Sequence, residues 1–180
     1  MYYLINQHID QLLLTIDATR DIQPYVSLIH NFNEVNVAAN MEFQRTYRRY
    51  WQLNAARLGE DFCKVYFALL EELKQERNTG VDTVARRLWE TPTHGDGRQS
   101  LQFSFASKLA HMLNNHLPIY DSLVESFYFL PTGSATEKFE EKLQRLLASY
   151  KFLIAEYNRV LANGLLAYAI ERFRAKFALG

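Results

Sequence analysis

The sequence predicts an all-α protein. Only 7 glycines and 4 prolines interrupt its 180 residues, so the intervals between helix-breaking residues are long. Within these intervals apolar residues recur three and four positions apart, which is the spacing of one helix face. The hydrophobic fraction of 48% and the charged fraction of 22% are typical of a globular protein. A chain of this length favours a single domain, residues 1–180, with about seven to nine helices.

Helical patterns fill the first half of the chain. The first predicted helix spans residues 4–16 and ends before Pro24, because a proline restricts the backbone of the residue before it. A short helix is expected around "YVSLIHNF", residues 25–32. Two longer helices follow at residues 37–53 and 56–76, and "RNTG" at residues 77–80 closes that pair.

The second half alternates helices with clear breaks. A short helix at residues 81–90 begins near Asp82, and "TPTHGDGRQS" at residues 91–100 is the most loop-like interval of the chain. The next helix is expected from Leu101 to about Asn115. It breaks at "NHLPIY", and a new helix begins at Asp121 or Ser122.

The last part of the chain is predicted to hold one long helix or two. Ser134 and Glu137 have the spacing of a capping box and indicate where this region begins. Asn163 and Gly164 mark the expected joint, since these residue types commonly follow the end of a helix.

Composition argues against several classes of function. The 20 basic and 20 acidic side chains give a formal net charge of zero, so overall charge does not favour nucleic-acid binding. A single cysteine, Cys63, cannot form a disulfide framework or a cysteine-rich zinc site within one chain. No apolar run approaches the roughly 20 residues of a membrane span, and we expect a cytoplasmic protein without a membrane partner. No nucleotide-binding or serine-hydrolase motif is present, and no cofactor is predicted.

The stretch "FSFASKLAHMLNNHLPIYDSLV", residues 103–124, contains the candidate chemistry. Lys108 lies in an apolar helical setting, where desolvation lowers the pKa of an amine and makes it a better nucleophile for carbonyl-like carbon. A long lysine side chain can also reach solvent from such a position. Asp121 begins the next helix, where free backbone N–H groups favour an ionised carboxylate. Such an aspartate serves as a helix cap, an electrostatic stabiliser or a base.

Together these residues resemble the lysine helix and following aspartate helix of the helix-hairpin-helix DNA glycosylase superfamily, in particular its 8-oxoguanine glycosylase-like branch. The resemblance implies that Lys108 attacks the sugar C1′ and forms a Schiff base, while Asp121 stabilises the charge on the sugar. It covers about 20 residues. Unlike the family, this chain has no glycine-rich hairpin immediately before the lysine, and its connection from Lys108 to Asp121 is shorter.

A basic helix face gives candidate DNA-binding residues. Arg45, Arg48 and Arg49 recur three and four positions apart and are interleaved with aromatic residues, as expected for a surface that contacts phosphates and bases. The same pattern also occurs on an ordinary solvated helix beside a core stripe. His111 follows Lys108 by three residues and is expected beside the lysine and among the DNA contacts. A metal site with His116 and Asp121 is disfavoured, because the two histidines are five residues apart.

Two functional hypotheses follow from the sequence. The first is a DNA glycosylase and lyase in which Lys108 and Asp121 face one pocket. The second is a non-catalytic helical protein that binds a partner or forms a homo-oligomer through its long carboxy-terminal helices, with residues 103–124 as a packed joint. A shared cleft for the two side chains is the structural feature that distinguishes these hypotheses.

Overall fold

A computed structural model of the chain describes residues 1–76, 79–134 and 136–178. Every regular element in these residues is helical, which confirms the all-α fold. Ten α-helices are found in them: α1 (Tyr2–Gln7), α2 (Ile9–Leu14), α3 (Gln23–Phe32), α4 (Met41–Tyr50), α5 (Glu60–Glu72), α6 (Val81–Trp89), α7 (Phe103–Leu113), α8 (Ser122–Phe127), α9 (Phe139–Ala162) and α10 (Ala167–Phe177). Short π-helical or 3₁₀ segments lie at Ala18–Ile22, Leu53–Ala56 and Leu73–Gln75. The turn expected at residues 77–80 falls partly outside the described residues, at 77–78.

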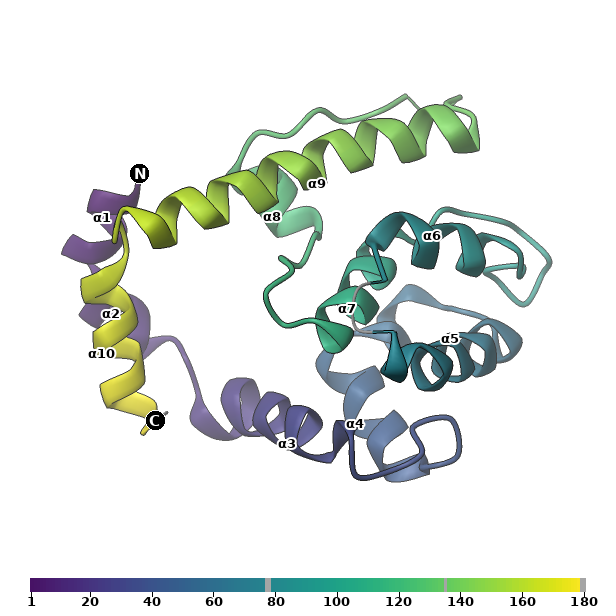
Figure 1. Cartoon of the computed structure of the whole chain (residues 1–180), viewed down its shortest axis with the longest axis horizontal. Coiled ribbons are helices and arrows are strands. Elements are labelled where there is room, and N and C mark those ends of the chain that lie inside the picture. Colours follow the sequence, from purple (N-terminus) through teal and green to yellow (C-terminus); the bar gives the residue numbers. More distant parts are fainter. Residues whose placement is uncertain (77–78, 135, 179–180) are drawn as a thin grey trace.

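The two ends of the chain lie side by side, with α10 next to α1 and α2 (Figure 1). Ile9, Leu13 and Ala169 form a small buried cluster there, separate from the main core. The long helix α9 extends from this terminal group to the region of α6, where the Trp89 and Phe139 rings stack at 4.4 Å. None of the described helices combines the length and the apolar character of a membrane-crossing segment.

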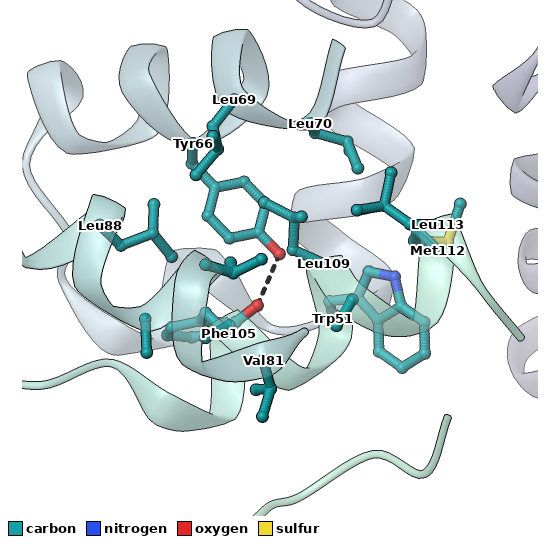
Figure 2. Packing of buried hydrophobic residues seen from close by; sticks show 14 of the residues in the cluster. Trp51, Tyr66, Leu69, Leu70, Val81, Leu88, Phe105, Leu109, Met112 and Leu113 are labelled. Carbon is teal, nitrogen blue, oxygen red and sulfur yellow. Dashed lines mark hydrogen bonds between the residues drawn. The ribbon is translucent and has the colours of Figure 1, made fainter. Parts of the chain in front are cut away.

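The main core is formed by side chains from α3 to α7 and from α9. Phe43 and Tyr47 give α4 its buried face, and Asn40 caps its first turn by accepting a hydrogen bond from the Phe43 N–H at 2.8 Å. The fully buried hydroxyls of Tyr47 and Tyr66 lie 2.7 Å apart. Tyr66 also donates to the Phe105 carbonyl oxygen at 3.0 Å, which fixes α7 against α5 (Figure 2).

Several predicted boundaries differ from the structure for identifiable reasons. The first predicted helix is divided at His8, which ends α1 and precedes α2. The helix predicted at 37–53 begins only after its cap Asn40. The long helix of this region, α9, begins at Phe139 after its cap Lys138 rather than next to Ser134, and Glu137 pairs with Arg145 at 2.9 Å. The joint at 163–164 is confirmed, and Gly164 has the positive φ of 59° that glycine tolerates best.

Candidate active site

Helix α7 places Lys108 in the protein interior. Its neighbours Ala106, Leu109 and Ala110 are fully buried, and Lys108 itself is only 9% exposed. The Lys108 Nζ donates a hydrogen bond to the Trp51 carbonyl oxygen at 3.2 Å. Nζ also lies 4.9 Å from the Phe105 ring centroid. The amine therefore sits among aromatic side chains with one carbonyl acceptor and no carboxylate within ion-pair distance in the described residues.

Burial changes the acid–base behaviour of this amine. Removal from water disfavours the charged form and lowers the pKa of Lys108 below the usual value of a lysine. The negative charge of Asp121 acts in the opposite direction and offsets part of that decrease. Lys108 consequently has a larger neutral, nucleophilic fraction than an exposed lysine at the same pH.

Asp121 is the cap of α8. Its Oδ1 accepts a hydrogen bond from the Val124 N–H at 2.9 Å, as the sequence predicts for an aspartate at the start of a helix. This bond restricts the rotation of the carboxylate. A carboxylate held in this way is a fixed negative charge beside the amine.

Lys108 and Asp121 line the same cleft, which has a volume of about 790 Å³. Aromatic and polar residues and one leucine complete its wall: Tyr50, Trp51, Gln52, Ser104, Phe105, Asp21, Ser122 and Leu123. This volume lies within the range of about 300–1,000 Å³ that is common for small-molecule sites. The cleft therefore combines a partly desolvated amine, a fixed carboxylate and aromatic surfaces.

A serine that sequence reasoning did not identify sets the relative positions of these two groups. Ser107 is fully buried, and its Oγ accepts a hydrogen bond from the Tyr120 N–H at 2.9 Å. Its own proton has two carbonyl acceptors within reach, those of Ser104 at 2.8 Å and Tyr120 at 3.2 Å. Because Ser107 precedes Lys108 and Tyr120 precedes Asp121, this contact joins the two candidate catalytic positions.

The segment between α7 and α8 is held at two further points. The Tyr150 hydroxyl donates to the Pro118 carbonyl oxygen at 2.8 Å. His111 Nδ1 lies 2.8 Å from the Leu117 carbonyl oxygen, and since that oxygen only accepts, Nδ1 carries the proton. These contacts anchor the connection at Leu117 and Pro118 to the core.

His111 uses both ring nitrogens inside the protein. Its Nε2 lies 2.8 Å from the Tyr25 hydroxyl, which donates to it when Nδ1 carries the only ring proton. Burial lowers the pKa of His111, and the hydrogen bond to Leu117 opposes that change. Its side chain thus lies among protein groups rather than in the Lys108 cleft. Within the described residues, no three histidine, cysteine or acidic side chains are close enough to hold a metal ion.

The structure separates the three arginines of α4. Arg45 and Arg49 are exposed and line a second groove of about 660 Å³. Arg48 turns away from this groove, with its guanidinium 3.0 Å from the Asn54 Oδ1 and 3.4 Å from the Glu60 carboxylate. The sequence pattern could not show this division, because Asn54 and Glu60 lie beyond the end of α4.

The second groove lies next to the Lys108 cleft. Asp21, Tyr50 and Gln52 line both, so the two hollows are adjacent on the surface. The Asp21 carboxylate is paired with the Arg20 guanidinium at 2.7 Å, which lowers the pKa of Asp21 to about 2. Gln52 stands at the junction in a left-handed backbone conformation, with φ of 58°, which is uncommon for a residue other than glycine.

Comparison with protein-family models, with curated proteins and with solved structures finds no match to this chain.

Proposed function

We propose that the protein is a DNA glycosylase and lyase that acts on a damaged nucleotide through a Schiff base at Lys108. The observation that carries this proposal is the shared cleft of Lys108 and Asp121, in which burial lowers the pKa of the amine. A catalytic lysine has to be neutral to attack carbon, and a nearby fixed carboxylate is suited to stabilise positive charge on a sugar.

The proposed reaction begins with the neutral Lys108 amine. Its nitrogen forms a bond to the sugar C1′ while the bond from C1′ to the base breaks, and the base leaves with the bonding electrons and takes up a proton. The departing base takes the proton that the amine loses on forming its bond to C1′. Opening of the sugar ring then gives a protonated imine between Lys108 and C1′, and the former ring oxygen takes up a proton from water and becomes a hydroxyl. Asp121 stabilises the positive charge that develops on the sugar in the first step.

The walls of the cleft support a nucleotide substrate. A base that leaves the DNA stack needs a pocket with aromatic or apolar surfaces. Trp51 and Phe105 flank the amine, and Tyr50 lies beside Trp51 with ring centroids 4.7 Å apart. The aromatic residues that lie among the arginines in the sequence have different positions. Tyr47 and Trp51 belong to the buried core and Tyr50 is partly exposed, while Tyr50 and Trp51 line the cleft.

Borohydride trapping on DNA tests this function. The protein is incubated with duplex and single-stranded DNA containing an abasic site or 8-oxoguanine, and borohydride reduces any imine to a stable adduct. We expect an adduct with the native protein, none with Lys108→Gln, and a slower reaction with Asp121→Asn, which preserves the cap. Lys151→Gln is the matched control, because Lys151 is exposed on α9. The absence of an adduct across these DNAs, or an adduct that persists in Lys108→Gln, would contradict the proposal.

A second candidate function is self-association through the carboxy-terminal helices. The observation that favours it is a set of exposed apolar side chains on α9 and α10, of which Tyr157 and Leu161 are one helical turn apart: Phe152, Tyr157, Leu161 and Tyr168. Such a surface is typical of a contact between protein chains. Sedimentation of the native protein and of Leu161→Glu over a range of concentrations tests this candidate. We expect the native protein to form dimers and Leu161→Glu to be monomeric. A native protein that is monomeric at all concentrations would contradict this second candidate function.

A further inference from the structure

We infer that Arg45 and Arg49 form a phosphate-binding groove that extends the Lys108 cleft along the substrate strand. This inference rests on the proposed function, since it assigns the path of the nucleic acid outside the reacting nucleotide. It also assigns different roles to the arginines of one helix, because Arg48 is excluded from the groove. Three observations support this inference: the positions of the two arginines, the charge of the groove, and the lining residues that it shares with the Lys108 cleft.

Arg45 and Arg49 are placed for joint contact with a polyanion. They are one helical turn apart, so they lie on the same face of α4 with about 6 Å between them along the axis. Phe43 and Tyr47 occupy the opposite, buried face of the helix. Arg45 and Arg49 are both exposed, and neither has an ion-pair partner among the described residues. They can therefore bind phosphate without first breaking an internal salt bridge.

The rest of the groove also suits phosphate oxygens. Hydroxyl and amide side chains, which can donate hydrogen bonds to a phosphate, line it beside the arginines: Thr19, Gln23, Ser27 and Thr46. Asp21 is the only acidic residue in this lining, and its charge is balanced by Arg20 at 2.7 Å. The groove consequently has excess positive charge although the whole chain is neutral.

The position of the groove next to the cleft indicates the path of a bound strand. A nucleotide held at Lys108 remains connected to its neighbours through phosphates, which have to leave the cleft at its mouth. Tyr50 and Gln52 line both hollows. A strand that leaves past these two residues enters the groove of Arg45 and Arg49. A small carbonyl compound bound at Lys108 would make no use of this groove.

The salt dependence of binding tests the inference. The full chain is titrated with a fluorescent oligonucleotide that contains a stable abasic-site analogue, as DNA and as RNA, at several salt concentrations. Each lost phosphate contact reduces the slope of log affinity against log salt by about 0.7 for a single strand and about 0.9 for a duplex. We expect the double variant Arg45→Gln/Arg49→Gln to bind about 10-fold more weakly near 0.1 M salt. Its slope should be smaller than the native slope by the amount expected for two phosphate contacts. The DNA and RNA arms identify which phosphate backbone the groove prefers.

Arg48→Gln is the matched control, because it removes the same charge from the same helix outside the groove. It should retain the native slope. An unchanged slope in Arg45→Gln/Arg49→Gln, or an equal loss in Arg48→Gln, would overturn the inference. Trapping at Lys108 could still occur in that case, so failure of the groove is distinguishable from failure of the lyase. Conversely, a slope that depends on Arg45 and Arg49, without any trapped adduct, would support the phosphate-binding groove and contradict the proposed lyase activity.

Discussion

The Ser107 hydroxyl accepts a hydrogen bond from the Tyr120 backbone N–H at 2.9 Å and thereby ties α7 to the residue that precedes Asp121. Both residues are buried, so this N–H has no access to water if the hydroxyl is removed. The distance between the candidate nucleophile and the candidate carboxylate therefore depends on a side chain that belongs to neither.

Ser107→Ala should lower the free energy of unfolding by about 1–3 kcal/mol, the usual cost of leaving a buried donor without a partner. It should also slow adduct formation, because Asp121 loses its fixed position relative to Lys108. Urea denaturation and trapping rates measure the two effects. Ser126→Ala, at an exposed position of α8, is the control and should change stability by less than about 0.5 kcal/mol. Equal stability of the two variants would show that the Ser107 contact contributes nothing.

Tyr66→Phe should destabilise the protein by about 1–3 kcal/mol, because it leaves the Phe105 carbonyl and the Tyr47 hydroxyl without their partner in the core. Figure 2 shows this hydroxyl pointing to the first turn of α7. Denaturant unfolding measures the loss. Tyr168→Phe removes a hydroxyl from a half-exposed ring and should leave stability nearly unchanged. A Tyr66→Phe protein as stable as this control would contradict the assigned role.

Lys108 should react with a small aldehyde at lower pH than an exposed lysine, because burial lowers its pKa. Asp121→Asn should shift this reaction to still lower pH, since the negative charge of Asp121 raises the pKa of Lys108 and the substitution removes it. Mass spectrometry after reductive alkylation measures modification at Lys108 and, as an internal reference, at exposed Lys151. A shift of the Asp121→Asn profile to higher pH would contradict the described electrostatics.

The same change in pKa predicts how stability depends on pH. The folded protein holds the Lys108 proton less tightly than the unfolded chain, so between the two pKa values the unfolded state binds more protons and stability rises with pH. Below the folded pKa, the native protein bears the full cost of a buried ammonium. Lys108→Met lacks this group, so its stability relative to the native protein should fall as the pH rises through that window. Urea denaturation at neutral and alkaline pH measures the difference, and a constant difference would contradict the prediction.

Local patterns were sufficient to predict much of the fold and part of the site. Apolar periodicity indicated the helices, because one buried face per helix is a local property of the sequence. Asp121 as a cap and the joint at 163–164 were likewise set by residues near them in the chain. The division at His8 had no such local signal, since neither proline nor glycine marks it.

Contacts between distant residues account for what the sequence could not show. The partner of Ser107 is 13 positions away, and the hydroxyl that meets His111 comes from Tyr25, 86 positions away. Arg48 differs from its neighbours on α4 because Asn54 and Glu60 lie within reach of it. The apolar pattern of the sequence indicates on which face of a helix a residue lies. The residue that it contacts on another element is determined by the folded structure.

The site of the trapped adduct tests the central claim most directly. The borohydride-reduced complex with abasic DNA is digested with a protease and a nuclease, and tandem mass spectrometry locates the residue that carries the sugar remnant. The proposed function predicts that this residue is Lys108, with no remnant on exposed lysines such as Lys151. A remnant distributed over exposed lysines, with Lys108 unmodified, would contradict it.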